Sequence, residues 1–369
     1  MKKILLPAGG VTLFLSVVLF AAVVTASRPG VSPVGPAVPL GPASTGAAED
    51  DLKGTVWVVN RDLGELAIFD AGTGDLLKTL AVGRGAHDIC ISEQTGKAYI
   101  TAETDNVVTV VDTKTLAKHS IMVRPLPHHV EPSNDGHTIY VSLASHTPAE
   151  GDAARYAAID TSDDSVTYLT SSDDATARSH AISPTLDGDR LYIAHDTGNQ
   201  VTAIDTATGS VDFIIRPILR AEESIPSRFG DLLWVSARGD NTVKRIDLAS
   251  HTVTGSVPIG VQPESIMLTP NELTLVVSLR GSPASLGFVD TLTLTSLGLV
   301  QIGPTGSAGD LAVMTTNGHH VFATYDNGTA GTGGVAVVDV RTRGIVDTWA
   351  YPGTGRPHGV WYSKKQARF

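Results

Sequence analysis

Residues 97–112, KAYITAETDNVVTVVD, contain the pattern that decides the fold: an apolar strand, a polar turn, and a second apolar strand that ends in an aspartate. The second strand and its aspartate recur along the chain, at Asp70, Asp112, Asp160, Asp205, Asp247, Asp290 and Asp339. Successive aspartates lie 42, 48, 45, 42, 43 and 49 residues apart. Seven units of about 45 residues, each long enough for four short strands, predict the blades of a β-propeller.

Two further landmarks predict how the ring of blades closes. An apolar strand that ends in a small polar residue recurs, as at 57–60 and 99–102, and so does a Gly/Pro-rich turn followed by an apolar strand, as at 83–92. The chain begins with the first landmark and ends with the second, so the strand near Val360 should complete a first blade formed by residues 54–82. This pairing removes an open sheet edge. The sequence therefore predicts an all-β, seven-bladed propeller closed by its C-terminal strand.

The composition of the 369-residue chain excludes several other classes of protein. Only 18% of the residues are charged, which is too few for a coiled coil or a long helical array. A formal net charge of −11 argues against a nucleic-acid binder, and a hydrophobic content of 42% excludes disorder throughout. The single cysteine, Cys90, cannot support a disulfide scaffold and is expected to be a buried apolar residue.

The repeats resemble the YVTN family of β-propellers, a seven-bladed fold that is also similar to the haem domain of nitrite reductase. Residues 99–101 (YIT), 106–112 (NVVTVVD) and 199–209 (NQVTAIDTATG) match the family pattern Y-V-T-N followed by N-x-V-x-V-I-D-x-x-T-G. The resemblance covers about residues 54–363, and it departs from the pattern at 143–157, 218–233 and 325–335. It implies a fold and not an activity, because propellers serve as binding modules, hydrolases and redox enzymes.

The N-terminal residues predict an exported protein. Lys2 and Lys3 precede the uncharged, apolar residues 4–24, and small residues allow cleavage after Ala26. This is the pattern of a secretory signal peptide, at residues 1–26. The apolar run is also long enough to span a bilayer, so an uncleaved N-terminal anchor is the alternative.

The remaining organisation follows from composition and from the repeats. The predicted parts are a Pro/Gly/Ala-rich linker at 27–50, the propeller at 51–363 and a C-terminal tail at 364–369. We expect a periplasmic or secreted monomer that contacts a membrane only if residues 4–24 are retained as an anchor.

Histidine is concentrated in the turns that precede the predicted innermost strands. Of 12 histidines in the chain, these turns contain five, where chance would place one or two: His87, His128, His129, His180 and His358. In a propeller the innermost strands begin at one face and line the central channel, and the loops between second and third strands open on the same face. The five histidines should therefore converge on one mouth of the channel. Other residues expected there are Arg61, Glu103, Arg178, His195, Asp196, Arg228, Arg238, Glu264, Arg280, Asp310, Asp326 and Arg356.

Three roles are open for the five histidines. Converging imidazoles and carboxylates can ligate copper, zinc or iron, or bind a haem axially. Nitrous oxide reductase has a similar ring of histidines on a seven-bladed propeller, but three of the turns here lack histidine, which argues against a full multi-copper cluster. The other two roles are capping of turns within a solvated channel, and acid–base chemistry or hydrogen bonding to a ligand. On balance the sequence favours turn residues and no cofactor.

Arg238 and Arg280 occupy the same register in adjacent blades, and two neighbouring guanidinium groups can hold a carboxylate or a phosphate. With Arg228 and Arg356 they would form a basic spot on an acidic protein. The alternative is that they pair with acidic residues of the same mouth, Glu264 and Asp310.

The seven repeated aspartates are predicted to accept hydrogen bonds in turns and not to act as metal ligands. Asn106, Asn199 and Asn241, which precede third strands, are likewise predicted turn residues.

These observations leave three functions open. The preferred one is an exported protein that binds a small anionic ligand or a protein partner through His87, His128, His129, His180, Arg228, Arg238, Glu264, Arg280, Asp310 and His358. A metal- or haem-dependent oxidoreductase, with the five histidines as ligands, is the second. The third is a lactonase-like hydrolase, because phosphogluconolactonase is similar in architecture. The sequence has no G-x-S-x-G, H-E-x-x-H, G-x-x-x-x-G-K-[ST] or C-x-x-C motif to choose among them.

Overall fold

The computed structural model describes residues 52–144, 155–172, 174, 177–327 and 332–365. The predicted signal peptide, the linker and most of the C-terminal tail lie outside these residues. Within the described part of the chain, no helix has the length and apolar character needed to cross a membrane.

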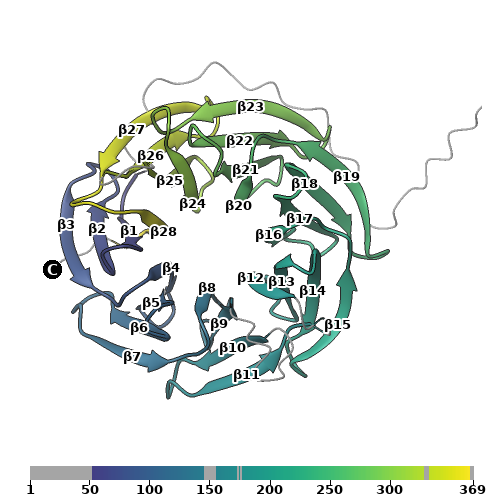
Figure 1. Ribbon diagram of the computed structural model, residues 1–369, viewed down its shortest axis with the longest axis horizontal. Helices are drawn as coiled ribbons and strands as arrows, with labels where there is room; N and C mark the ends of the chain where they lie inside the picture. The colour runs from purple at the N-terminus through teal and green to yellow at the C-terminus, as the bar shows by residue number, and fades with distance from the viewer. Residues whose placement is uncertain (1–51, 145–154, 173, 175–176, 328–331, 366–369) are drawn as a thin grey trace, which may run out of the picture. The chain divides into compact units, whose positions relative to one another are not determined.

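The described residues form seven four-stranded antiparallel sheets arranged as the blades of a propeller (Figure 1). Blade 1 consists of β28 (Pro357–Ser363), β1 (Thr55–Asn60), β2 (Glu65–Asp70) and β3 (Leu76–Ala81). Blade 2 consists of β4 (Ala86–Ser92), β5 (Lys97–Ala102), β6 (Val107–Asp112) and β7 (Lys118–Met122). Blade 3 consists of β8 (Pro127–Pro132), β9 (Thr138–Leu143), β10 (Arg155–Asp160) and β11 (Val166–Thr170).

The other four blades repeat this order from the channel outward. Blade 4 consists of β12 (Arg178–Pro184), β13 (Arg190–Thr197), β14 (Gln200–Asp205) and β15 (Ser210–Ile215). Blade 5 consists of β16 (Ala221–Pro226), β17 (Leu232–Ala237), β18 (Thr242–Asp247) and β19 (Thr252–Pro258). Blade 6 consists of β20 (Pro263–Leu268), β21 (Thr274–Leu279), β22 (Ser285–Asp290) and β23 (Thr295–Gln301). Blade 7 consists of β24 (Ala308–Met314), β25 (His320–Asp326), β26 (Gly334–Asp339) and β27 (Gly344–Ala350).

The predicted closure of the ring is confirmed. The C-terminal strand β28 pairs antiparallel with β1, with Thr55 opposite Ser363 and Trp57 opposite Trp361. Residues from the two ends of the described chain therefore share one sheet, and every blade has four strands (Figure 1).

The seven repeated aspartates are turn residues, as predicted. Each is the last residue of its blade's third strand. At Asp112, one carboxylate oxygen accepts N–H bonds from Lys114 and Thr115 at 3.0 and 2.8 Å. These hydrogen bonds hold the pKa of Asp112 below its ordinary value.

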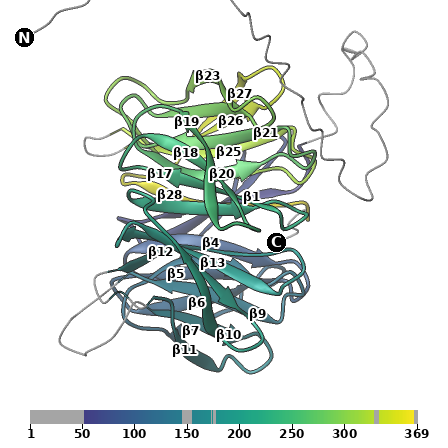
Figure 2. The same cartoon turned by 90° about the vertical axis from the view of Figure 1, so that its right-hand side faces the viewer.

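The apolar core lies between neighbouring blades, which are stacked face to face around the ring (Figure 2). Between blades 7 and 1, the Phe69 and Trp349 rings stack with their centroids 5.7 Å apart, as do the Phe322 and Tyr362 rings. All six residues of β1 are buried, whereas β3 at the outer edge is almost entirely exposed. Cys90 is fully buried in the core between blades 2 and 3, as expected.

At four of the seven blade junctions, a buried hydroxyl group near the end of a second strand bonds to the innermost strand of the next blade. The Thr101 hydroxyl donates to the His128 carbonyl at 2.6 Å, and the Ser236 hydroxyl donates to the Glu264 carbonyl at 2.6 Å. Thr324 and Ser142 make the same bond to the carbonyls of His358 and His180. These bonds explain the recurrent small polar residue, and they fix the heights of neighbouring innermost strands relative to one another.

Candidate functional site

The seven innermost strands each present one polar residue at the same level of the channel. In every blade, one residue of the innermost strand pairs with an equivalent residue of the second strand, such as Ile89 with Ile100 and Ser224 with Val235. The residue two positions before this paired residue of the innermost strand is polar in every blade. In blade order from 1 to 7, these residues are His358, His87, His128, His180, Glu222, Glu264 and Asp310. We call these seven residues the channel ring. It has four consecutive histidines and three consecutive carboxylates, each at most 6% exposed.

Asparagine turns place three members of the channel ring. In three blades, the side-chain oxygen of an Asn accepts a hydrogen bond from a backbone N–H of the next blade. The donor lies two positions before the channel-ring residue of that blade. The pairs are Asn106–Leu126, Asn199–Arg220 and Asn241–Gln262, with N–O distances of 2.9, 2.9 and 2.8 Å. All six residues have φ between 46° and 57°, a region that Asn tolerates better than most residues. The predicted turn role of these asparagines is confirmed.

The histidine half of the channel ring forms a continuous contact of imidazoles. The His87 ring centroid lies 3.8 Å from that of His128 and 4.0 Å from that of His358. His129 also reaches this cluster, 4.9 Å from both His128 and His180. A β-bulge allows both His128 and His129 to reach the cluster. The register of β8 shifts between Pro127 and Val130, and within such a bulge two successive side chains need not point to opposite faces of the sheet.

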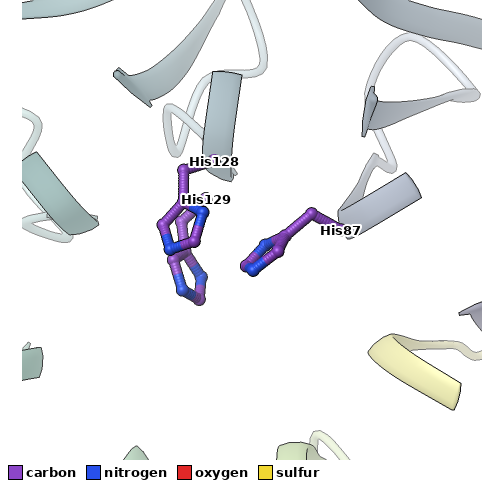
Figure 3. A group of neighbouring side chains, drawn as sticks. All are labelled: His87, His128 and His129. Carbon is purple, nitrogen blue, oxygen red and sulfur yellow. The ribbon is translucent and has the colours of Figure 1, made fainter. Parts of the chain in front are cut away.

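The His87, His128 and His129 side chains extend toward one another (Figure 3), and carboxylates bind two of these imidazoles from behind. The Nδ1 atom of His128 lies 2.5 Å from Oε1 of Glu103, and Nδ1 of His129 lies 3.1 Å from Oδ2 of Asp88. The buried Nε2 atoms of both histidines, and Nδ1 of His87, have no hydrogen-bond partner among the described residues. One ring nitrogen from each of His87, His128 and His129 lies within 4.8 Å of the other two.

The electrostatics favour the neutral form of all four histidines of the channel ring, but not of the neighbouring His129. Burial, with smaller effects from neighbouring charges, lowers the pKa values of His87, His128, His180 and His358 well below the ordinary value. His129 differs: burial lowers its pKa, but the hydrogen bond and the charge of Asp88 outweigh burial and raise it. Neutral imidazoles are the form that binds a metal ion.

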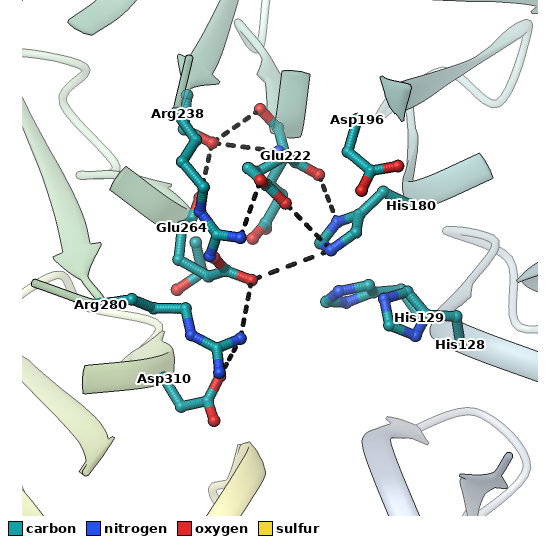
Figure 4. Close-up of polar contacts among 12 residues, drawn as sticks. His128, His129, His180, Asp196, Glu222, Arg238, Glu264, Arg280 and Asp310 are labelled. Atoms are coloured by element: carbon teal, nitrogen blue, oxygen red, sulfur yellow. Dashed lines mark hydrogen bonds and ion pairs between the residues drawn. The ribbon is translucent and has the colours of Figure 1, made fainter. Parts of the chain in front are cut away.

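The carboxylate half of the channel ring is paired with arginine (Figure 4). The Arg238 guanidinium contacts both Glu222, at 2.9 Å, and Glu264. Arg280 lies farther from its partners, 3.5 Å from Asp310 and 3.8 Å from Glu264. Burial raises the pKa of Asp310 to about 6 and lowers that of Arg238 to about 10.

His180, Glu222 and Glu264 form a second group with metal-ligand spacing. His180 Nε2 lies 3.0 Å from a Glu222 carboxylate oxygen, and its Nδ1 lies 2.8 Å from the Glu222 carbonyl. The Arg238 guanidinium lies against both glutamates, and Arg220 adds a second positive charge 3.4 Å from Glu222, so a cation would have to compete with both arginines. The three histidines are the better candidate for a metal site.

The structure brings most of the predicted site residues to this mouth, but Arg228 is an exception. It lies in the β16–β17 turn, at the opposite end of that hairpin from Arg238, and its N–H donates to Glu272 at 2.5 Å. There it lines a cavity of about 450 Å³ at the other end of the innermost strands. The sequence prediction used Pro226 to mark the beginning of an innermost strand, whereas Pro226 is the last residue of β16.

Two other predicted residues lie apart from the histidine cluster. His195 is fully buried within blade 4, where its Nε2 lies 3.1 Å from the Thr202 hydroxyl, and burial lowers its pKa to about 4. Arg356 is exposed and pairs with Asp62 at 2.8 Å.

Sequence reasoning missed two residues of the site, Glu222 and Asp88. Glu222 could have been found, because it lies 42 residues after His180 and 42 residues before Glu264. Asp88 gives a weaker signal: it follows His87 directly, as His129 follows His128 in the next blade.

No protein-family model matches this chain, and no curated protein sequence matches it. The YVTN resemblance therefore stays a prediction. Solved structures share the fold. A protein of unknown function from Desulfotomaculum acetoxidans has a TM-score of 0.69 and 12% identity, covering 86% of this chain and 100% of that one.

Two other similar structures carry functional names. The dihydro-haem d1 dehydrogenase NirN, in complex with DHE, has a TM-score of 0.58 and 15% identity, covering 88% of this chain and 78% of that one. A putative 6-phosphogluconolactonase from Bacteroides fragilis has a TM-score of 0.66 and 14% identity, covering 88% of this chain and 100% of that one. At these identities the similarity shows a shared fold alone.

Proposed function

We propose that this protein is a metal-dependent enzyme of the cell exterior, which binds one Zn²⁺ or Cu²⁺ ion through His87, His128 and His129. The observation that carries the proposal is the pair of carboxylate-oriented imidazoles, Glu103–His128 and Asp88–His129, whose Nε2 atoms are buried and unpartnered within the described structure. A carboxylate behind a histidine fixes the tautomer and the orientation of a metal ligand.

The ligand set favours a single ion of this class. Imidazole nitrogens suit zinc and copper, and a catalytic zinc site uses three protein ligands with one open position. Nitrogens bound at 2.0–2.1 Å around a tetrahedral ion lie about 3.3 Å apart. The three nitrogens here lie within 4.8 Å of one another, so small rotations of the side chains complete the site.

A haem fits these residues less well. Haem iron takes axial ligands from above and below a flat ring. Here three imidazoles on two adjacent strands, β4 and β8, converge on one point (Figure 3). The N-terminal signal pattern adds the expectation that the ion is acquired after export.

Titration of the metal-free protein with Zn²⁺ or Cu²⁺, followed by calorimetry, tests this function. We expect one equivalent to bind to the wild type and binding to be lost in a variant with His87, His128 and His129 all replaced by Ala. His119→Ala is the matched control, because His119 is exposed on the outer strand β7 and pairs with Asp164. Absence of stoichiometric binding, or unchanged binding by the triple variant, would refute the proposal.

A further inference from the structure

The Arg280 guanidinium contacts two carboxylates of the channel ring, Glu264 and Asp310, but only at long distance. A guanidinium has five N–H donors. The two ion pairs of Arg280, at 3.5 and 3.8 Å, are too long for charge-assisted hydrogen bonds, and its side chain makes no hydrogen bond within the described residues. By contrast, Arg238 contacts the ring residue Glu222 at 2.9 Å, and Arg61 donates to Glu103, behind His128, at 2.6 Å. The Arg280 side chain is 26% exposed, so its donors are partly open to the channel mouth and available to a ligand.

Arg280 also faces the histidine cluster across the channel. It follows β21 of blade 6, whereas His87 lies on blade 2 and His128 and His129 lie on blade 3. In a ring of seven, blades 2 and 3 are the two farthest from blade 6 (Figure 1). The close-up shows the Arg280 guanidinium and the His128 and His129 rings extending toward the centre of the mouth from different sides (Figure 4).

We propose that the substrate is a small oxyanion, a carboxylate or a phosphate, that lies between the bound metal ion and Arg280. One oxygen takes the open position on the ion, and another accepts hydrogen bonds from the guanidinium. The planar fork of Arg280 suits the paired oxygens of either anion. This inference rests on the proposed function, because it needs the metal ion at His87, His128 and His129.

The local charges make metal binding a precondition for anion binding. The ion-paired carboxylates around the site are Asp88, Glu103, Asp196, Glu222, Glu264 and Asp310, and the guanidinium groups are those of Arg61, Arg178, Arg220, Arg238 and Arg280. Six negative and five positive groups, with the imidazoles counted as neutral, leave a formal charge of −1, which repels an anion. A divalent ion on neutral imidazoles changes this charge to +1. We therefore expect the oxyanion to bind to the metal-loaded protein and not to the metal-free protein.

The inference can be tested with Co²⁺ as a visible-absorption probe of the metal site. The Co²⁺-loaded full chain is titrated with acetate and, separately, with inorganic phosphate. We expect at least one of the two to change the Co²⁺ spectrum saturably, and Arg280→Gln to weaken that binding by about tenfold or more. Arg280→Lys keeps the charge but not the fork, so it should give an intermediate affinity. Metal-free protein should bind neither anion in calorimetry.

The outcomes separate this inference from the metal proposal. Arg84→Gln is the matched control, since Arg84 lies 77% exposed on the same face and pairs with Asp105, and it should bind the anion like the wild type. The anion site is wrong if Co²⁺ binds normally but neither anion changes its spectrum, or if Arg280→Gln binds the anion as tightly as the wild type. If Co²⁺ does not bind to the wild type, both proposals are wrong.

Discussion

Replacing Glu103 by Gln should weaken metal binding without touching a metal ligand. Glu103 lies behind His128, with its Oε1 2.5 Å from Nδ1, while its Oε2 accepts from Arg61 at 2.6 Å. Gln has nearly the same size and can still accept a hydrogen bond, but it lacks the negative charge that orients the imidazole and increases its basicity. The side chain of Glu103 is only 11% exposed, so water replaces this interaction poorly.

The size of this effect follows from the behaviour of carboxylates behind metal-bound histidines. Loss of such a partner typically costs 10–100-fold in metal affinity, or about 1.4–2.8 kcal/mol. We expect Glu103→Gln to weaken Zn²⁺ binding by this factor, measured by competition with a chromogenic chelator. In a His128→Ala background the same substitution should have little further effect, because its partner is already missing.

The control is Asp105→Asn, two residues along the same loop. Asp105 accepts hydrogen bonds from Arg84 and contacts none of the three histidines, so its substitution should leave the Zn²⁺ affinity unchanged. If Glu103→Gln binds Zn²⁺ as tightly as the wild type while His128→Ala does not, Glu103 does not position His128.

Three further predictions concern the stability of the propeller and the independence of the two ends of its channel. Thr101→Val removes the hydrogen bond from the fully buried Thr101 hydroxyl to the His128 carbonyl, so it should lower the free energy of unfolding, measured in urea, by about 1–3 kcal/mol. The control Thr73→Val, at an exposed position, should leave this free energy unchanged. Equal stabilities of the two variants would contradict the bridging role of Thr101. Asp112→Ala should lower the melting temperature at pH 7. Because the pKa of Asp112 is lower in the folded state, its carboxylate stabilises the fold above the unfolded pKa of 3.8, and this stabilisation is lost as the pH falls through the folded-state pKa. If the melting temperatures of the wild type and the variant differ as much at pH 2.5 as at pH 7, the carboxylate is not the source of the stabilisation. Arg228→Ala, on the opposite face, should alter neither Zn²⁺ nor anion binding, and a loss of either would show that the two ends of the channel are coupled.

The fold could be predicted because its signals are local and repeated. Each aspartate that ends a third strand stabilises its own turn, and seven copies at similar spacing make the period visible even where single copies are weak. Closure followed from the order of landmarks at the two ends of the chain, since pairing of β28 with β1 removes an open edge.

The site could be predicted only in part, because side-chain direction depends on details that the sequence pattern does not contain. The five histidines converge because propeller geometry brings the starts of the innermost strands together. The approach of both His128 and His129 to one point depends on a β-bulge, against the alternation expected of a regular strand. His195 shows the converse, since it is close in sequence to the mouth but its side chain is buried inside its own blade.

The error at Arg228 and the omission of Glu222 have one cause. The turn of the fifth blade lacks the histidine found in the turns of blades 1 to 4, and Pro226 drew the predicted strand toward the wrong end of β16. The arginines needed the structure as well. The sequence left a free basic spot and pairing with acidic residues equally open, and the distances separate the clamped Arg238 from the loosely held Arg280.

X-ray absorption spectroscopy of the Zn²⁺-loaded protein tests the central claim most directly. Three imidazole nitrogens at 2.0–2.1 Å, with one further light ligand, are the predicted first coordination sphere, and the variant with His87, His128 and His129 replaced by Ala should retain no zinc with this signature. A coordination sphere dominated by carboxylate oxygens, or one unchanged in that variant, would contradict a metal site at these three histidines.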